Sequence, residues 1–484
     1  MYNSIQRFQT EGIADLEKTF DSYAQDPKKI AEMVRAVTKE VTKLGLDMIA
    51  EEWESYDEIL RDRKHYRRGW HIVRKDETSL VTSLGTVAYH KTLFKNKTTG
   101  EYCYLLDRLM GIDKHARMTE DAVARILEEA VDSSYRKGGE NVSIDVTEVS
   151  KETVMNKIHA LRFPKAEPGE KRHVERIYID ADEDHVSLQY LNEKGDIRKP
   201  RQNTVMPRIV YVYDGVDTES GCRPMLSNAR YFGGEYAGAE GVKELWAEVL
   251  NYISDAYELD DVERIYVNGD GAQWIREGAK TLPKAKFVLD KYHMHKYITA
   301  ATAHLEDSAG DARSEIYHAI HKKKKWMAEN TFDGIIAVTP TGNKRKTVEQ
   351  AKTYILGNWA GIMLSMEGKD PNIRCSAEGH VSHVYSDRMS SRPLGWSRVG
   401  VDKMARLRIY KMNGGDMLAL VRYQKQEMPA VSNEEEVVFS AEFMLEMEKK
   451  RRKELGELAG LKMYSIPYPQ VRKIAAIKNR IWGL

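Results

Sequence analysis

Three short segments, far apart in the chain, each place a carboxylate beside turn-forming residues. Two of them, residues 177–182 and 265–270, have the apolar pattern of β-strands with Asp at or near the end, and the third, residues 375–380, contains Glu378. Carboxylate oxygens are the ligands that Mg²⁺ prefers, and two such ions catalyse in-line phosphoryl transfer. If the fold gathers these carboxylates, they form a site for two divalent cations.

The first of these positions has two candidates. Asp180 and Asp182 lie two residues apart, so the period of a strand directs both to one face and does not separate them. Asp182 lies nearer the turn and Asp180 lies deeper in the strand, so both stay candidates at this point. Asp270 is followed by Gly271, which allows close backbone approach to a ligand. The competing interpretation for each Asp alone is a turn or a helix cap.

Periodicity divides the chain into regions. Apolar residues at three- and four-residue steps, such as those between Ile30 and Met48, predict that residues 1 to about 60 are helical, and β-forming residues at 80–94 and 102–106 predict a small antiparallel sheet. Helices predicted at 118–130 and 150–161, joined by a glycine-containing link, suit a helix-turn-helix that reads the major groove. An ordinary helical hairpin is the alternative.

Beyond a Pro/Gly-rich linker at 163–172, the order of elements changes. The predicted elements are strands at 176–182, 185–191 and 208–213, a helix at 245–253 and a fourth strand at 264–267. This is the order of an RNase H-like fold, in which strands one and four end side by side. The long interval between Asp270 and Glu378 contains helical patterns and predicts an inserted domain.

We therefore predict an α/β RNase H-like catalytic core with a mixed sheet and an all-α insertion. An α+β N-terminal DNA-binding region precedes it and a helical C-terminus follows. The predicted regions are an N-terminal helical region at 1–75, a small sheet with the helix-turn-helix at 76–165, the core at 170–290 and 372–425, the insertion at 291–371 and the C-terminal helices at 426–484.

Composition limits the classes of function. Hydrophobic residues make up 42% and charged residues 31%, a balance typical of globular proteins. Without a membrane-length apolar run or a signal-peptide pattern, we expect a cytoplasmic, nucleoid-associated bacterial protein with no membrane partner. Three scattered cysteines argue against a disulfide framework. The net charge is only +1, but basic residues cluster at 61–68, 321–325 and 449–453, and such clusters can follow a phosphate backbone.

Four motifs together resemble a known family. They are Asp-Ala-Asp-Glu-Asp-His-Val at 180–186, Asn-Gly-Asp-Gly-Ala at 268–272, Leu-Asp-Lys-Tyr-His at 289–293 and Ser-Ala-Glu-Gly-His at 376–380. Their order is similar to that in bacterial insertion-sequence transposases of the ISLre group, once filed as an uncharacterised protein family, and more distantly to that in Mutator-like DDE transposases. The resemblance extends over most of the chain. It implies that Asp182, Asp270 and Glu378 form a catalytic and metal-binding DDE triad with two Mg²⁺ or Mn²⁺ ions.

The same resemblance assigns supporting residues. Asp290 and His293 match an Asp-x-x-His motif and would support the site, whereas zinc binding by His293 and His295 is the weaker alternative. Asp387 is the fallback for the third carboxylate.

Candidate DNA contacts lie in three places. They are Lys151, Asn156 and Lys157 on the outer face of the 150–161 helix, Lys323 and Lys324 in the insertion, and Arg388, Arg392 and Trp396, which suit phosphate gripping and base stacking. Solvated helix faces and a core tryptophan are the competing interpretations.

The resulting prediction is a DNA transposase that binds double-stranded DNA at terminal inverted repeats and at a target. It would act as a homodimer or larger homo-oligomer in metal-dependent strand cleavage and strand transfer. The alternatives are an RNase H-like structure-specific nuclease and a non-catalytic DNA-binding protein derived from a transposase.

Overall fold

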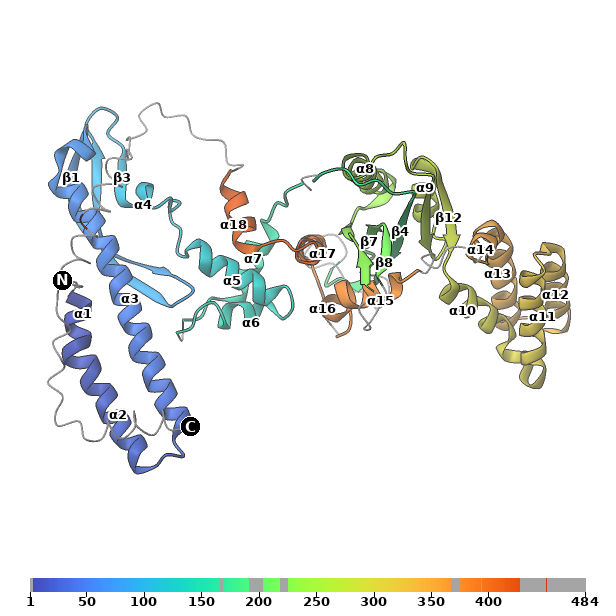
Figure 1. The fold of residues 1–484 in the computed structure, drawn as a ribbon, viewed down its shortest axis with the longest axis horizontal. Helices are drawn as coiled ribbons and strands as arrows, with labels where there is room; N and C mark the ends of the chain where they lie inside the picture. The colour runs from blue at the N-terminus through green and yellow to red at the C-terminus, as the bar shows by residue number, and fades with distance from the viewer. Residues whose placement is uncertain are drawn as a thin grey trace. The chain divides into compact units, whose positions relative to one another are not determined.

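The chain is a mixed α/β protein with two compact units, seen in a computed structural model (Figure 1). The structure describes residues 3–145, 147–165, 169–190, 203–217, 225–366, 375–392, 394–426 and 450. One unit comprises Met1–Ile126, Arg136–Ser150 and Glu427–Leu484, and the other comprises Leu127–Tyr135 and Lys151–Gln426. The predicted C-terminal helices at 426–484 and the basic cluster at 449–453 lie almost entirely outside the described residues. Within those residues, every helix is too short or too polar to cross a membrane.

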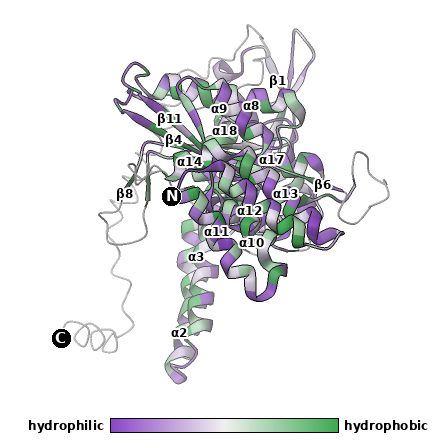
Figure 2. Cartoon of the chain, turned by 90° about the vertical axis from the view of Figure 1, so that its right-hand side faces the viewer, coloured by the Kyte–Doolittle hydropathy of each residue, from purple (hydrophilic) through white to green (hydrophobic). Residues whose placement is uncertain are grey.

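The first unit combines a long helix with a three-stranded antiparallel sheet in the order β1-β2-β3. Its elements are α1 (Asn3–Arg7), the π-helix η1 (Phe8–Gly12), α2 (Ile13–Gln25), α3 (Ile30–Asp62), η2 (Lys64–Arg67), β1 (Trp70–Val81), β2 (Thr86–Asn96), β3 (Tyr102–Tyr104), α4 (Leu105–Leu109) and most of α5 (Glu120–Ala130) and α6 (Tyr135–Glu140). The end of α5, from Leu127, and the first residue of α6, Tyr135, belong to the second unit. Hydrophilic and hydrophobic residues alternate along α3 (Figure 2), and Leu60 near its end packs with Trp70 and Phe94 in the core.

Two predictions for this unit need correction. Residues 70–75, expected in the N-terminal helical region, belong to β1, because Trp70 is buried in the core beneath the sheet. The link expected between two helices is itself helical, since α6 contains Gly138 and Gly139, and both glycines are buried there. Residues 120–159 thus contain three helices where two were predicted, so the predicted helix–link–helix pattern is wrong.

The second unit is built on a five-stranded mixed sheet in the order β10-β7-β4-β11-β12. Its first elements are α7 (Lys151–His159), β4 (Arg176–Glu183), β5 (Val186–Ser187), β6 (Thr204–Val205), β7 (Arg208–Tyr213), β8 (Gly215–Asp217), β9 (Met225–Ser227), β10 (Arg230–Gly234), α8 (Gly238–Ala256), β11 (Arg264–Gly269), α9 (Gln273–Thr281) and β12 (Ala285–Leu289). β4 pairs antiparallel with β7 and parallel with β11, so the sheet changes direction at β4.

The two faces of this sheet carry different side chains. Ile177 and Ile179 of β4 pack with α8 and α9, where Trp246 and Ile275 complete an apolar core. Because side chains alternate along a strand, Tyr178, Asp180 and Asp182 lie on the other face. Tyrosines form stacked and tilted pairs across that face, including Tyr178 with Tyr213 and Tyr211 with Tyr231. The candidate carboxylates therefore share a face with tyrosines.

Sequence patterns located most of this sheet, with one error. The predicted strands at 176–182, 208–213 and 264–267 correspond to β4, β7 and β11, and β4 and β11 are neighbours as expected. The predicted strand at 185–191 is not part of the five-stranded sheet in its described residues, 185–190. Val186 and Ser187 form β5 there, which pairs with β6 in a separate two-stranded sheet. The strand that pairs with β7 at one edge of the five-stranded sheet is instead β10. The strand at the other edge, β12, was not predicted.

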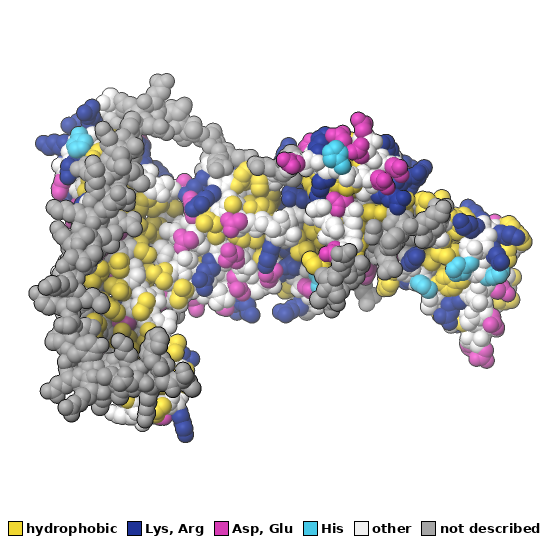
Figure 3. Space-filling view, viewed as in Figure 1, with side chains coloured by type: hydrophobic (Ala, Val, Ile, Leu, Met, Phe, Trp, Pro, Cys, Tyr) yellow, Lys and Arg dark blue, Asp and Glu magenta, His cyan; other side chains and the backbone are white. Residues whose placement is uncertain are grey.

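After β12 the described chain is helical. The elements are α10 (Lys291–Thr302), η3 (Ala303–Ser308), α11 (Ala309–His321), α12 (Lys325–Val338), α13 (Asn343–Gly357), α14 (Trp359–Met366), α15 (Ala377–Val381), the π-helix η4 (Ser382–Ser386), α16 (Asp387–Met389), α17 (Arg398–Met412) and α18 (Met417–Gln426). Helices α10 to α14 bury their own apolar core, which Leu289 at the end of β12 joins. Acidic, basic and histidine side chains are interspersed on the viewed surface of these helices (Figure 3).

Candidate active site

The register of two parallel strands brings the first two candidate carboxylates to corresponding positions. β4 and β11 pair so that Asn268 lies opposite Asp180. Two residues further along the chain, Asp182 lies within β4 and Asp270 directly follows the last residue of β11. Carboxyl ends of neighbouring parallel strands meet at one edge of a sheet, which is where α/β proteins commonly bind ligands. The two aspartates therefore stand at one such edge.

Asp182 is held where ionisation is unfavourable. Its side chain is 9% exposed, and burial is the main cause that raises its pKa to about 7, with the charges of Asp270 and Glu378 adding to the increase. Its Oδ1 accepts a hydrogen bond from the Glu183 backbone N–H at 2.9 Å, which opposes the increase. Glu183 also has a raised pKa, through burial and then Asp270. Burial and neighbouring carboxylates thus both disfavour the ionised forms of these two side chains.

Asp270 is fixed by the turn that follows β11 and by the helical insertion. Its Oδ1 accepts from the Ala272 N–H at 2.8 Å, which closes the turn into α9, and Gly271 has a φ of +87°. The Tyr354 hydroxyl of α13 donates to the Asp270 carbonyl, and its ring stacks on Tyr297 of α10. The insertion therefore braces the strand end that carries Asp270.

Glu378 lies in the first turn of α15, and its side chain is exposed. It is close enough to Asp182 to influence that residue's pKa. Across the described ranges, however, no three His, Cys, Asp or Glu side chains are grouped closely enough to hold one metal ion. The three carboxylates interact without forming a closed cage, and the zinc alternative at His293 and His295 gains no support. Mg²⁺ needs only one or two carboxylates when waters and substrate phosphates supply the remaining ligands, so this oxygen donor set fits that ion.

The Asp290–His293 pair lies beside the two aspartates. Asp290 caps α10 by accepting from the backbone N–H groups of Tyr292 and His293, and its Oδ2 lies 2.9 Å from His293 Nδ1. This hydrogen bond is the main cause that raises the pKa of His293, and Asp270 and Asp182 contribute. The cationic form of His293 therefore offsets part of the local negative charge.

Asp180 has a different environment from Asp182. It is completely buried, and donors from Tyr211, Tyr213, Asn268 and Ser376 surround its carboxylate. Burial raises the pKa of Asp180. Two aspartates that the strand period could not separate are thus distinguished by their surroundings.

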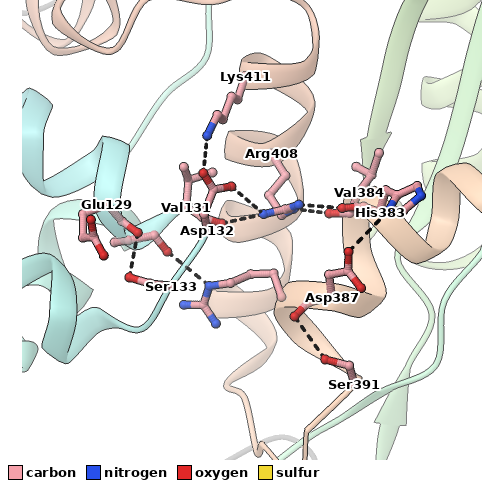
Figure 4. A network of polar contacts seen from close by, with 12 residues as sticks. Glu129, Val131, Asp132, Ser133, His383, Val384, Asp387, Ser391, Arg408 and Lys411 are labelled. Atoms are coloured by element: carbon pink, nitrogen blue, oxygen red, sulfur yellow. Dashed lines mark hydrogen bonds and ion pairs between the residues drawn. The ribbon is translucent and has the colours of Figure 1, made fainter. Parts of the chain in front are cut away.

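The segment after Glu378 is anchored by two arginines, and Figure 4 shows the contacts of one of them, Arg408. Arg408 of α17 donates to the carbonyl of Val131, just beyond α5, at 2.7 Å and to the His383 carbonyl of η4 at 2.6 Å. Arg388 donates to the Ala130 carbonyl at 3.1 Å, and its guanidinium lies over the Trp396 ring. These contacts fix the α15–η4–α16 segment at its far end.

This packing corrects two predicted DNA contacts. Arg388 and Trp396 are only 7% and 6% exposed, so neither side chain is free to grip a phosphate or stack a base. Trp396 also donates its indole N–H to the Met389 carbonyl at 3.0 Å. Asp387, the fallback carboxylate, lies on the surface with its Oδ2 3.4 Å from His383 Nδ1.

The other predicted DNA-contacting residues are on the surface. Exposed side chains are those of Lys151, Asn156, Lys157, Lys323, Lys324 and Arg392. Val154 and Ile158 of α7 are buried, and α7 packs against α17 within the second unit.

Sequence reasoning missed four residues around the site. Tyr211, Tyr213 and Ser376 bind Asp180, and Tyr354 holds the Asp270 carbonyl. The two-residue spacing of Tyr211 and Tyr213 on a predicted strand was a usable signal, because it places both on one face. Ser376 and Tyr354 are brought in by tertiary structure and had no local signal.

Fold and site together define a mixed α/β protein with a carboxylate-rich edge on its central sheet. The chain belongs to the uncharacterised protein family UPF0236, whose model matches residues 24–427. UPF0236 protein TTE2489 of Caldanaerobacter subterraneus subsp. tengcongensis is 37% identical over 405 residues, 83% of each chain. Another relative from the same organism is 35% identical over 420 residues, 86% of this chain and 85% of its own.

A solved structure, the Drosophila P element transposase strand transfer complex, aligns with 67% of this chain and 84% of its own at 11% identity. The TM-score of this alignment is 0.23.

Proposed function

We propose that this chain is a DDE-type DNA transposase that cuts DNA at the ends of a mobile element and joins those ends to a target. The carrying observation is that Asp182 lies near the end of β4 and Asp270 directly follows the neighbouring parallel strand β11, while Asp270 and Glu378 are both close enough to raise the pKa of Asp182. The sheet, antiparallel on one side of β4 and parallel on the other, has the order expected of an RNase H-like core.

In this proposal Asp182 and Asp270 hold divalent ions, Mg²⁺ or Mn²⁺, and Glu378 completes the ligands. When bound, such ions activate the attacking oxygen and stabilise the leaving one. Tyr354 fixes the backbone at Asp270, and Asp290 orients His293 and raises its pKa near the acidic edge. The proximity of these carboxylates supports a cation-binding role, because ionised carboxylates that lie close together repel one another until a cation neutralises them.

The family gives a second, independent kind of support. The name of one relative joins eleven designations within one organism. A gene that is present in several copies would give one protein several designations. A transposase produces such copies when it moves the element that carries its own gene.

Double-stranded DNA is the proposed partner. Lys151, Asn156 and Lys157 on α7, together with Lys323 and Lys324, would contact phosphates along the element ends, consistent with their exposure. A reaction that brings two ends together needs at least two active sites, so the proposal includes a homodimer or larger assembly.

The test uses the full chain, labelled duplexes from the DNA that flanks its own gene, and Mg²⁺ or Mn²⁺. Joined products support a transposase, cleavage without joining indicates a structure-specific nuclease, and a mobility shift alone indicates a non-catalytic binder. Asp270→Asn should remove cleavage while leaving DNA affinity unchanged. Asp255→Asn, at an exposed carboxylate of α8, is the matched control and should cleave normally. Normal cleavage by Asp270→Asn would refute the assignment.

A further inference from the structure

Asp180 is the centre of a buried polar network on the tyrosine face of the sheet. Its Oδ2 accepts from the Tyr211 hydroxyl at 2.8 Å and from the Ser376 backbone N–H at 2.8 Å, with the Ser376 hydroxyl at 3.2 Å. Its Oδ1 accepts from the Asn268 amide at 2.7 Å and the Tyr213 hydroxyl at 3.3 Å. These donors come from β7, β11 and the residue before α15, so one carboxylate joins three parts of the chain.

This carboxylate has no capacity left for a cation. An ionised carboxylate offers about four lone-pair sites, and donors of this chain already approach it in five contacts. Its exposure is 0%. Asp180 is therefore unsuited to be the metal ligand, although it lies two residues from Asp182 on the same face.

The network reaches Glu378 through its sequence neighbours on both sides. Ser376 is the residue before α15, and Glu378 follows two positions later in the first turn. His380, one turn on, places its Nδ1 3.0 Å from the Ser376 carbonyl oxygen and its ring 4.5 Å from that of Tyr211. Ser376 lies two residues before Glu378 and His380 two residues after it. Ser376 is thus tied to Asp180, and His380 to Ser376 and to Tyr211.

A purely structural role explains this arrangement poorly. Burying a carboxylate costs stability even when it is hydrogen-bonded, and well-packed apolar residues often serve a fold equally well. Among the described residues, the hydrogen bonds to this carboxylate come from neutral donors, so no arginine or lysine offsets its burial in these contacts. What the carboxylate supplies is a directed acceptor that can hold a backbone N–H of a separate segment against the sheet.

We propose that Asp180 is a positioning residue that sets the place of Glu378 relative to Asp182 by holding Ser376 against β4. The inference rests on the proposed function, because it assigns Asp180 an effect on metal binding through Glu378. Asp180 itself touches neither the ions nor the DNA in this proposal.

The test measures Mn²⁺ binding to the full chain by electron paramagnetic resonance of the free ion, so it does not depend on strand cleavage. Removal of groups that orient a metal ligand typically weakens metal binding about 10- to 100-fold. We expect Asp180→Asn to weaken Mn²⁺ binding at least about tenfold when Glu378 is present. In a Glu378→Gln background the same change should alter the affinity by less than about twofold, because residues that act through one another are not additive. Equal weakening in both backgrounds would overturn the proposal.

A matched pair of milder variants keeps the test informative if Asp180→Asn fails to fold. Ser376→Ala and Tyr213→Phe each delete one hydroxyl that contacts Asp180, at 3.2 and 3.3 Å, but only Ser376 lies on the Glu378 segment. Ser376→Ala should weaken Mn²⁺ binding several-fold, and Tyr213→Phe should leave it within about twofold. Equal effects of the two variants would mean that the network acts only on stability.

Failure of the proposed function would give a different result. If Asp182→Asn and Asp270→Asn both leave Mn²⁺ binding unchanged, the metal site itself is wrong. If these two variants lose binding while Asp180→Asn and Ser376→Ala do not, only the positioning role is wrong.

Discussion

The raised pKa of Asp182 predicts that this carboxylate destabilises the metal-free protein at neutral and alkaline pH. Its ordinary value is 3.8, and burial next to Asp270 and Glu378 raises it to about 7. A pKa difference of about 3 corresponds to about 4 kcal/mol. Because Asp182 is 9% exposed and nearby groups can relax, we expect Asp182→Asn to stabilise the second unit by about 2–4 kcal/mol at pH 8 without metal.

The sign of the pH dependence follows from the proton count. Between pH 3.8 and 7 the folded state keeps the Asp182 proton and the unfolded state loses it, so stability falls as pH rises through this window. Asn does not titrate. The difference in free energy of unfolding between Asp182→Asn and the native chain should therefore increase by about 2–3 kcal/mol from pH 5 to pH 8 and stay constant above pH 8.

Hydrogen exchange of the β4 and β11 amides in EDTA measures this locally, in native and variant proteins at the same pH. A gain of about 3 kcal/mol corresponds to roughly 100-fold slower exchange. Mg²⁺ at about 100 times its Kd should stabilise the folded native chain by about 2.7 kcal/mol and should not stabilise the variant. Asp255→Asn should change neither value. A gain that is absent at pH 8, or equal at pH 5 and pH 8, would refute the assigned pKa and its cause.

Three further predictions separate chemistry, DNA binding and packing. Glu378→Gln should change stability by less than about 0.5 kcal/mol, because the side chain is exposed, and should abolish cleavage in a gel assay; normal cleavage would exclude a catalytic role. Combined Lys323→Ala and Lys324→Ala should lower the slope of log affinity against log salt by about 2 in mobility shifts, and an unchanged slope would remove both from the interface. Gly278→Ala should cost about 1–3 kcal/mol in chemical denaturation, because a Cβ there would lie 2.0 Å from the Trp246 ring; a neutral result would mean that the ring can move freely.

The strands that carry the aspartates were predictable because local pattern and tertiary position agree. The β4 and β11 segments are apolar runs that end in turn residues, and their parallel pairing follows from the helical crossover between them. β10 was not predictable by the same reasoning, since Gly233 and Gly234 weaken the strand signal. Packing requires glycine at position 233, where a Cβ would lie 2.0 Å from the Tyr385 hydroxyl.

Side-chain chemistry near Glu378 was a poorer guide, because burial decides what a charged or aromatic group does. Arg388 and Trp396 have the residue types of a phosphate and base contact, yet they pack on each other and on Tyr135. Arg388 uses its guanidinium to satisfy a carbonyl at the end of α5. The sequence contains no local sign of that partner, which lies more than 250 residues away in the chain.

Asp180 and Asp182 show how one pattern leads to two roles. The strand period gives both the same face, but Asp180 lies opposite Asn268 inside the paired part of β11, whereas Asp182 lies beyond it, near Asp270. Inside, neutral donors surround the carboxylate and Ser376 covers it. At the edge, Asp182 accepts from a single backbone N–H and is placed among like charges. A cation would relieve that repulsion at Asp182 and would find no free oxygen at Asp180. For this reason the edge carboxylate is the one assigned to chemistry and the inner one to holding the segment that carries Glu378.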